Sequence, residues 1–209
     1  MKIYTTLSAL KAVNLLSADK DVRHYLIGVQ VTATATATRL TATDGHALGI
    51  HQSEQQNEGV DFVEMIIPND VIKLIKSASK NVDTVVIDTE DGITGTIGAI
   101  TGAAVSFKAI DGKFPDVQRV MPKSLSGEPA QFQPYLLEKF SKASKLLGSK
   151  NGLINVAYNG ASTALVKIDA TQNFIGLVMP LRPIYDAEEG KTIPSWANEQ
   201  LSAPVTKAA

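Results

Sequence analysis

Residues 111–122 of the chain read DGKFPDVQRVMP, and two shorter strings stand far from them: TATDGHAL at residues 41–48 and LVMPLR at residues 177–182. None of the three carries catalytic residues in a recognisable arrangement. Leucine, valine, methionine and proline provide apolar surface, and a methionine side chain adapts to different guests. Together the three strings predict one surface pocket that is assembled from distant parts of the chain.

Composition allows one large globular domain or two small ones, since the chain has 209 residues, of which 44% are apolar and 20% charged. No apolar run reaches the length of a membrane span, and the N-terminus lacks the pattern of a secretory signal. The absence of cysteine excludes disulfides, thiolate metal ligands and a cysteine nucleophile. We therefore expect a cytoplasmic protein without membrane contact.

The net charge of −1 constrains any contact with nucleic acid. Nucleic-acid-binding proteins usually carry a positive excess. If this chain meets DNA, its cations must therefore be concentrated on one face and offset elsewhere.

Hydrophobic periodicity predicts one plan used three times: a strand, an amphipathic helix, and then further strands. We call each such set a half-unit. The predicted helices are residues 7–16, 71–80 and 131–148, with Asn69 or Asp70 as the cap of the second helix. The predicted strands are residues 2–5, 25–32, 37–43, 47–51, 64–68, 84–89, 93–97, 103–109, 153–158, 164–169 and 173–179.

Each helix has one apolar side, so it must cover a sheet, which predicts an α+β fold. We expect a domain of two half-units at residues 1–122, a third half-unit at residues 130–182, and an irregular tail at residues 183–209. A short helix is expected within that tail, at residues 196–201.

Four strings follow one another in the order seen in a known family: DVRHYLIGVQV, TATDGHALGI, EMIIPNDVIKLIK and VSFKAIDGKFPDVQRVMPK. In these strings the chain resembles the middle domain of bacterial sliding clamps, the processivity subunit of the replicative DNA polymerase. Residues 132–182 resemble the second half of that family's last domain. The resemblance implies the DNA-clamp fold, with helices on one face of antiparallel sheets. Family members have three domains of two half-units each, so three half-units indicate a shortened, divergent relative.

The resemblance implies a groove that binds short linear peptides of polymerases and clamp-loader-type proteins. Carried over position by position, the groove consists of Leu26, Thr43, Gly45, His46, Leu48, Pro115, Arg119, Val120, Leu177, Val178, Met179, Pro180, Leu181 and Arg182. The family often has a basic residue at the position of Ala47, so the choice of partner is open. The alternative is that the strings are ordinary strand ends, with DGH as a tight turn.

Clamp helices line the central hole of the ring, so the resemblance also implies contact with double-stranded DNA. The candidate residues come from two helices and from the KDVRHY loop: Lys20, Arg23, His24, Tyr25, Lys73, Lys76, Lys80, Lys139, Lys142 and Lys145. Contacts of this kind are made to phosphates and are independent of sequence. The alternative is that the lysines are simply solvated.

No enzymatic pattern is present: the three histidines match no known metal-ligand spacing, and the glycines near residue 95 precede no helix. We expect a non-catalytic processivity factor without cofactor or metal, forming a homo-oligomer; open assemblies and a monomer remain alternatives. The rival function is a clamp-derived binding module that sequesters or redirects clamp-binding proteins without encircling DNA. The QLSAP string at residues 200–204 loosely resembles a clamp-binding peptide, which suggests that the tail occupies a groove.

Overall fold

A computed structural model describes residues 1–77, 81–182, 193 and 195–198 of the chain. Its α-helices are α1 (Leu7–Asn14), α2 (Asn69–Leu74) and α3 (Pro134–Leu146), and its 3-10 turns are η1 (His24–Leu26), η2 (Val117–Arg119) and η4 (Ser195–Asn198). The strands are β1 (Lys2–Thr6), β2 (Gly28–Thr34), β3 (Ala37–Thr43), β4 (Ala47–Glu54), β5 (Phe62–Pro68), β6 (Thr84–Thr89), β7 (Thr94–Ala99), β8 (Val105–Lys108), β9 (Ile154–Ala157), β10 (Ala164–Ile168) and β11 (Phe174–Val178).

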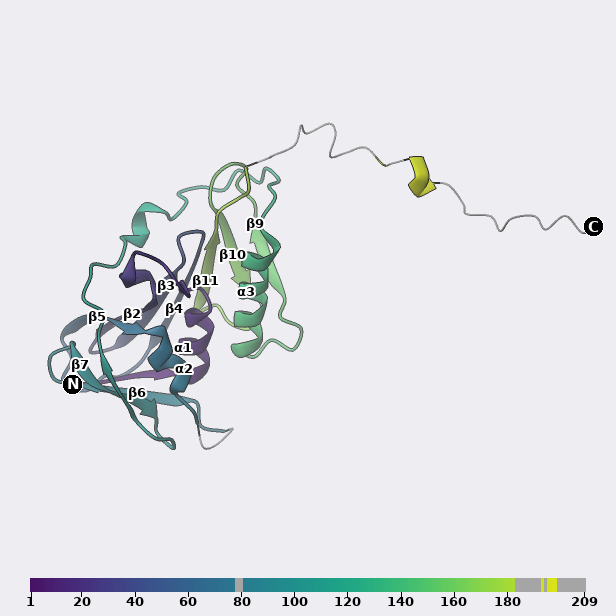
Figure 1. Cartoon of the computed structure of the whole chain (residues 1–209). Coiled ribbons are helices and arrows are strands. Elements are labelled where there is room, and N and C mark those ends of the chain that lie inside the picture. The colour runs from purple at the N-terminus through teal and green to yellow at the C-terminus, as the bar shows by residue number, and fades with distance from the viewer. Residues whose placement is uncertain (78–80, 183–192, 194, 199–209) are drawn as a thin grey trace, which may run out of the picture.

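The strands form two antiparallel sheets, one in the order β1-β6-β7-β8 and one in the order β5-β2-β3-β4-β11-β10-β9. The helices α1, α2 and α3 lie side by side and cover one face of the larger sheet (Figure 1). The predicted α+β class with antiparallel sheets is confirmed. Since β11 pairs with β4, the larger sheet runs without a break from the first half-unit into the third.

The first two half-units exchange strands. The strand before α1, β1, pairs with β6 of the second half-unit. The strand before α2, β5, pairs along its whole length with β2 of the first half-unit. Neither sheet is therefore complete without strands from both half-units. The boundaries of the predicted domains stay a prediction.

The helices begin and pack for local reasons. The hydroxyl of Thr6 caps α1 by accepting from the backbone N–H of Ala9 at 3.2 Å. Proline at the first position of α3 costs no hydrogen bond, because that N–H has no partner in a helix. Leu10 of α1 and Phe140 of α3 are fully buried against the larger sheet. The predicted apolar stripe of α3 is therefore the face that reaches the core.

The second helix is shorter than predicted. The sequence predicts a helix over residues 71–80, but α2 ends at Leu74 and Ile75 adopts extended backbone angles. Leaving the helix lets Ile75 turn completely into the core, while Leu74 stays exposed. Pro68 occupies the N-cap position and makes no side-chain cap, but the predicted residue Asp70 accepts from the backbone N–H of Val71 at 2.8 Å. The Asn69 amide is buried and donates to the carbonyl of Ala18. Lys76 thus lies beyond the helix, and residues 78–80 lie outside the described part of the chain.

Candidate functional site

Apolar residues gather on the face of the larger sheet that is turned away from the helices. Strand pairing sets Leu177 beside Leu48 and Ile175 beside Ile50. Leu48, Ile50 and Leu177 form a small buried cluster, against which pack Val117, Met121, Leu165 and Ile175. Segments from all three quoted strings therefore meet at one place. We call this set of residues the outer cluster.

The DGH string forms the tight turn between β3 and β4. One oxygen of the Asp44 carboxylate accepts from the backbone N–H groups of His46 and Ala47, each at 2.8 Å. Gly45 has φ of +91°, a conformation that glycine adopts without strain. The backbone N–H of Met179 donates to the carbonyl of His46 at 2.9 Å, which fastens the end of β11 to this turn.

The other oxygen of Asp44 pairs with Lys139 of α3. The Asp44 Oδ2 to Lys139 Nζ distance is 2.7 Å, and the two side chains are only 12% and 24% exposed. A short ion pair with little solvent is stronger than one at the surface, provided that its groups stay hydrogen-bonded. The pair therefore ties the third half-unit to the turn that carries His46.

The predicted groove residues fall into exposed and buried groups. Gly45, His46, Pro115, Arg119, Val120, Met179 and Arg182 are exposed, and Pro180 and Leu181 are half-buried. Thr43, Leu48 and Leu177 are buried on the outer face. Val178 follows Leu177 in the strand and therefore points to the opposite, helix-covered face, where it joins the main core. Leu26 is buried and belongs to neither apolar cluster.

The structure also contains a hollow that does not coincide with the predicted groove residues. A hollow of about 930 Å³ adjoins the outer cluster, and Ile50, Gln118, Met121 and Ile175 are among the residues that line it. The fourteen predicted residues are not part of this lining. Because side chains of a strand alternate between its faces, Ile50 and Ile175 could have been found two residues from Leu48 and Leu177. The sequence shows no such alternation for Val117 and Met121, because they lie in and just after the 3-10 turn η2 and not in a strand.

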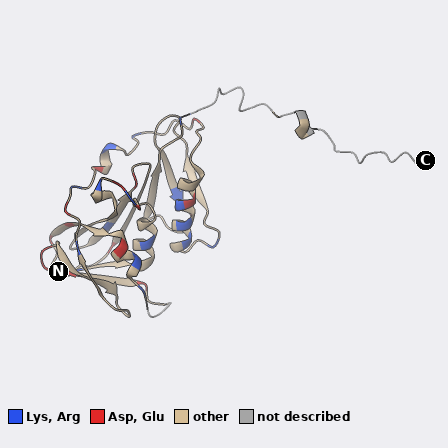
Figure 2. Ribbon diagram, in the orientation of Figure 1, with Lys and Arg blue, Asp and Glu red and all other residues tan. Residues whose placement is uncertain are grey.

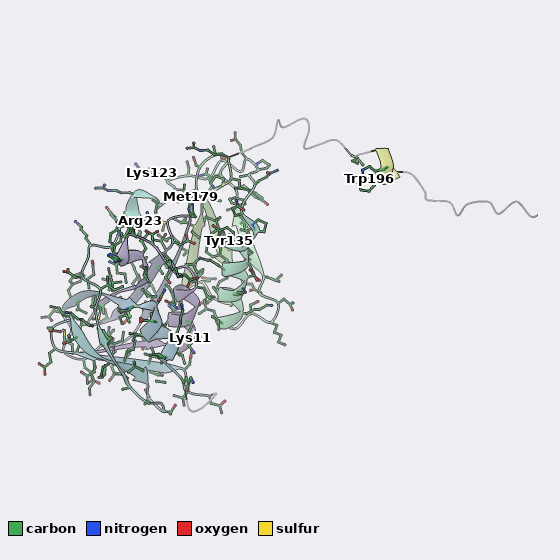
Figure 3. The ribbon with its side chains drawn as sticks, in the orientation of Figure 1. Lys11, Arg23, Lys123, Tyr135, Met179 and Trp196 are labelled. Atoms are coloured by element: carbon green, nitrogen blue, oxygen red, sulfur yellow. The ribbon has the colours of Figure 1, made fainter. Side chains whose placement is uncertain are left out.

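Exposed residues frame the outer cluster at one end of the molecule. Met179 is 49% exposed and lies in the same region as Arg23 and Lys123, far from Lys11 of α1 (Figure 3). The guanidinium of Arg119 pairs with Asp116 at 3.5 Å, and both side chains are largely exposed. An exposed pair of this kind contributes little to stability, so Arg119 can exchange its partner for a ligand.

The helix face carries cations, several of which already have acidic partners. Figure 2 shows Lys on all three helices, with an acidic residue on α2 and on α3 as well. Lys73 pairs with Asp19 at 3.4 Å and Lys142 with Glu138 at 2.8 Å, both in the open. Lys139 points instead to Asp44, as described above. The structure thus brings the predicted lysines to one face but partly neutralises them, and Lys80 lies outside the described residues.

The KDVRHY loop lies beside the DGH turn. A side chain added to Gly45 would come within 3.0 Å of the Arg23 guanidinium. Arg23 also holds Asp21 at 2.8 Å, and hydrogen bonds from its side chain and backbone lower the pKa of Asp21 to about 2. Lys20 and His24 are exposed, and Tyr25 is half-buried. Sequence alone assigned Arg23 to DNA, whereas the structure sets it against a predicted groove residue.

In the described ranges, no helix is long and apolar enough to cross a membrane. No group of three or more His, Asp or Glu side chains that could hold a metal ion occurs in that part of the chain either. His51 is buried, which lowers its pKa, and its Nδ1 has no hydrogen-bond partner.

Comparisons with known proteins agree with this arrangement. The family described as DNA polymerase III beta subunit, central domain, matches residues 4–116. The beta sliding clamp of Vibrio cholerae is 32% identical over 148 residues, and that of Pseudomonas aeruginosa 29% over 153 residues. Each alignment covers 68% of this chain but only 39% and 41% of the relative. The chain thus spans about two fifths of the length of these relatives.

Solved structures match in fold. The Pseudomonas aeruginosa sliding clamp superposes with a TM-score of 0.64 at 20% identity, and the beta subunit of Thermotoga maritima with 0.67 at 13%. Both matches cover 88% of this chain and 66% of the other. With the family's central domain matching residues 4–116, more than half of the sequence, this chain belongs to the DNA polymerase III beta subunit family, the bacterial sliding clamps.

Proposed function

We propose that the chain acts as a clamp-type processivity factor. It holds a polymerase or another replication or repair protein at duplex DNA through a peptide that binds on the outer face. The observation that carries this proposal is the meeting of three remote segments around Leu48, Ile50 and Leu177. Membership of the sliding clamp family supports it, and so does the non-catalytic role that this family implies.

The peptide site has the chemistry that a short linear ligand needs. Ile50, Met121 and Ile175 contribute apolar surface to the hollow beside the outer cluster, whose lining is otherwise mostly polar and includes Gln52, Gln118 and Asn173. Met179 and His46 are exposed at the other end of β4 and β11 and are joined through their backbones. A peptide with a glutamine and two or three apolar anchors would bind here in the micromolar range, about −8 kcal/mol.

The substitution Met179→Ala tests the site. We expect it to weaken binding of a fluorescent glutamine-and-leucine peptide about tenfold, or about 1.4 kcal/mol, because an apolar anchor contact is lost. Fluorescence anisotropy with the purified chain measures the affinity. The matched control is Ile100→Ala, which removes an equally exposed apolar side chain near the end of β7 in the other sheet. Equal affinities of the two variants and the wild type would remove Met179 from the site.

One observation favours the second candidate function, a clamp-derived module that sequesters clamp-binding proteins without encircling DNA. Lys73, Lys139 and Lys142, all expected to face DNA, each have a carboxylate partner. Phosphate contacts by these lysines would have to displace Asp19, Asp44 or Glu138. Both candidate functions use the same peptide site, and they differ only in whether the protein is retained on DNA. The cytoplasmic location and the specific polymerase partner stay predictions.

A further inference from the structure

One backbone hydrogen bond recurs in all three half-units. In each, the chain that follows the last strand donates an N–H to a carbonyl in the segment that precedes the helix. The three bonds are Glu58 to Lys2 at 2.9 Å, Ile110 to Ile66 at 2.9 Å, and Leu181 to Gln131 at 2.7 Å. Residues 130–133, directly before α3, are therefore held in the same way as β1 and β5.

On its other side, the segment before each helix has a partner strand in the first two half-units but not in the described part of the third. β1 pairs there with β6 and β5 pairs there with β2. Residues 130–133 are not part of a strand, and within the described residues no strand pairs with them. The third half-unit thus holds a strand-like segment ready for pairing, without the partner that the other two possess.

The same half-unit also has an open acceptor edge. β9 ends the larger sheet, at the margin of the molecule next to α3 (Figure 1), and in the part of the chain that the structure describes it pairs only with β10. In the first two half-units, the strand at this position, β2 or β6, receives the strand before the partner's helix. Among the residues that the structure describes, the third half-unit therefore has neither a partner for its donor segment nor a strand at its acceptor edge.

β9 is short, but it carries neither the charges nor the proline that usually protect an edge strand. Edge strands are normally protected by charged residues, above all lysine, or by proline. β8 carries Lys108, and β5 carries Glu64 and Pro68, whereas β9 reads INVA. Leu153, just before β9, is 57% exposed, and a hollow of about 500 Å³ beside β9 is lined partly by Leu125, Leu153 and Ile154.

We propose that the β9 edge binds a second copy of this chain, with residues 130–133 of each copy pairing with β9 of the other. The exchange repeats between two chains what β1 and β5 do within one. A second copy fits better than an unrelated strand because each copy brings one donor and one acceptor. A two-fold axis then satisfies both copies at once, whereas a one-way partner would leave one edge open.

The repeat also predicts which residues of the 130–133 segment and of β9 would face each other. The residue two places before each helix pairs with the first core-facing residue of the acceptor strand: Thr5 with Val85, and Ile67 with Val29. In the third half-unit these positions are Phe132 and Ile154, which both pack against the main core. Gln131 of one copy should then lie opposite Asn155 of the other, and both side chains are exposed.

Mass and cross-linking test the proposal on the full chain. Sedimentation equilibrium should give twice the mass of the chain, with dissociation on dilution. The double variant Gln131→Cys, Asn155→Cys should form a reducible covalent dimer on mild oxidation, because facing strand residues lie within disulfide reach. The chain contains no cysteine of its own, so only the introduced thiols can react.

A matched variant checks the chemistry. Thr32→Cys with Glu64→Cys joins facing residues of β2 and β5, and should give a disulfide within one chain. The proposal is overturned if the wild type is a monomer at every concentration, or if the 131–155 disulfide forms within one chain. Amide hydrogen exchange then identifies the cause. Protected β9 amides in a monomer would assign the edge to the chain's own residues, and rapid exchange would show that it stays open.

Discussion

Asp44 shows how much one side chain contributes at the outer face. Its carboxylate accepts from two backbone N–H groups of its own turn and pairs with Lys139 of another half-unit. The turn that Asp44 stabilises carries His46, whose carbonyl accepts a hydrogen bond from the backbone N–H of Met179. The resemblance assigned Lys139 to DNA, and its ion pair with Asp44 predicts that it also positions the candidate peptide site.

Replacing Lys139 by methionine should therefore affect both stability and peptide binding. The substitution leaves the half-buried Asp44 without its cation, which should lower the free energy of unfolding by about 1–3 kcal/mol. Peptide affinity should fall too, because the His46 turn loses its tie to α3. Urea unfolding and anisotropy measure the two effects.

Lys142→Met is the matched control for Lys139→Met. It breaks the Lys142–Glu138 pair on the same helix, where the side chains are 58% and 61% exposed. Such a pair is worth at most about 0.5 kcal/mol. If both variants unfolded alike and bound peptide like the wild type, the Asp44–Lys139 pair would have no positioning role.

At the level of elements, two facing glycines set how closely the helices approach the larger sheet. Gly49 of β4 and Gly176 of β11 are paired residues on the helix-covered face. An added side chain at Gly49 would meet Leu16 at 3.1 Å, and one at Gly176 would collide with the ring of Phe140. The junction between the first and third half-units therefore depends on the absence of side chains there.

The variant Gly176→Ala should destabilise this junction. Phe140 is fully buried and stacks edge-on against Phe174, so it cannot move aside without disturbing the core. Overpacking of this kind costs about 1–3 kcal/mol, measurable by thermal or urea unfolding. The control is Gly112→Ala in an exposed loop, where the nearest atom is the Tyr25 Cβ at 3.2 Å. Unfolding of Gly176→Ala at the wild-type midpoint would contradict the tight contact.

Taken as a whole, the molecule separates its two candidate surfaces by one sheet. The helices with their lysines cover one face, and the outer cluster occupies the other (Figures 1 and 2). A protein with this arrangement can contact DNA and a peptide at the same time. The proposed reciprocal pairing at the β9 edge would join two such molecules.

Retention on DNA separates the two candidate functions. A processivity factor that encircles DNA should stay on nicked circular DNA after loading and be lost when the circle is linearised. Direct binding should weaken as salt rises, because it depends on phosphate contacts. The double variant Lys73→Ala, Lys145→Ala should weaken it further. Equal retention on circular and linear DNA, or none on either, would favour the sequestering module.

Much of the fold could be predicted from the order of residues because its signals are local. Alternating apolar residues and helical periodicity located the strands and helices, with β3 and β6 predicted to the residue. The end of α2 could not be predicted, because burial of the Ile75 side chain in the core outweighs the helical pattern of VIKLIKSASK. The sequence also contained the three strings that meet at the outer cluster.

Only the tertiary structure decided which partners these residues have. Lys139 and Asp44 are far apart in the sequence, so nothing local predicts that their charges meet. The pairing of β11 with β4 sets the outer face, turns Val178 inward, and brings Ile50, Met121 and Ile175 to the hollow. Periodicity states which face of a strand is apolar. It does not state which remote strand lies beside it, because that choice depends on the packing of the whole chain.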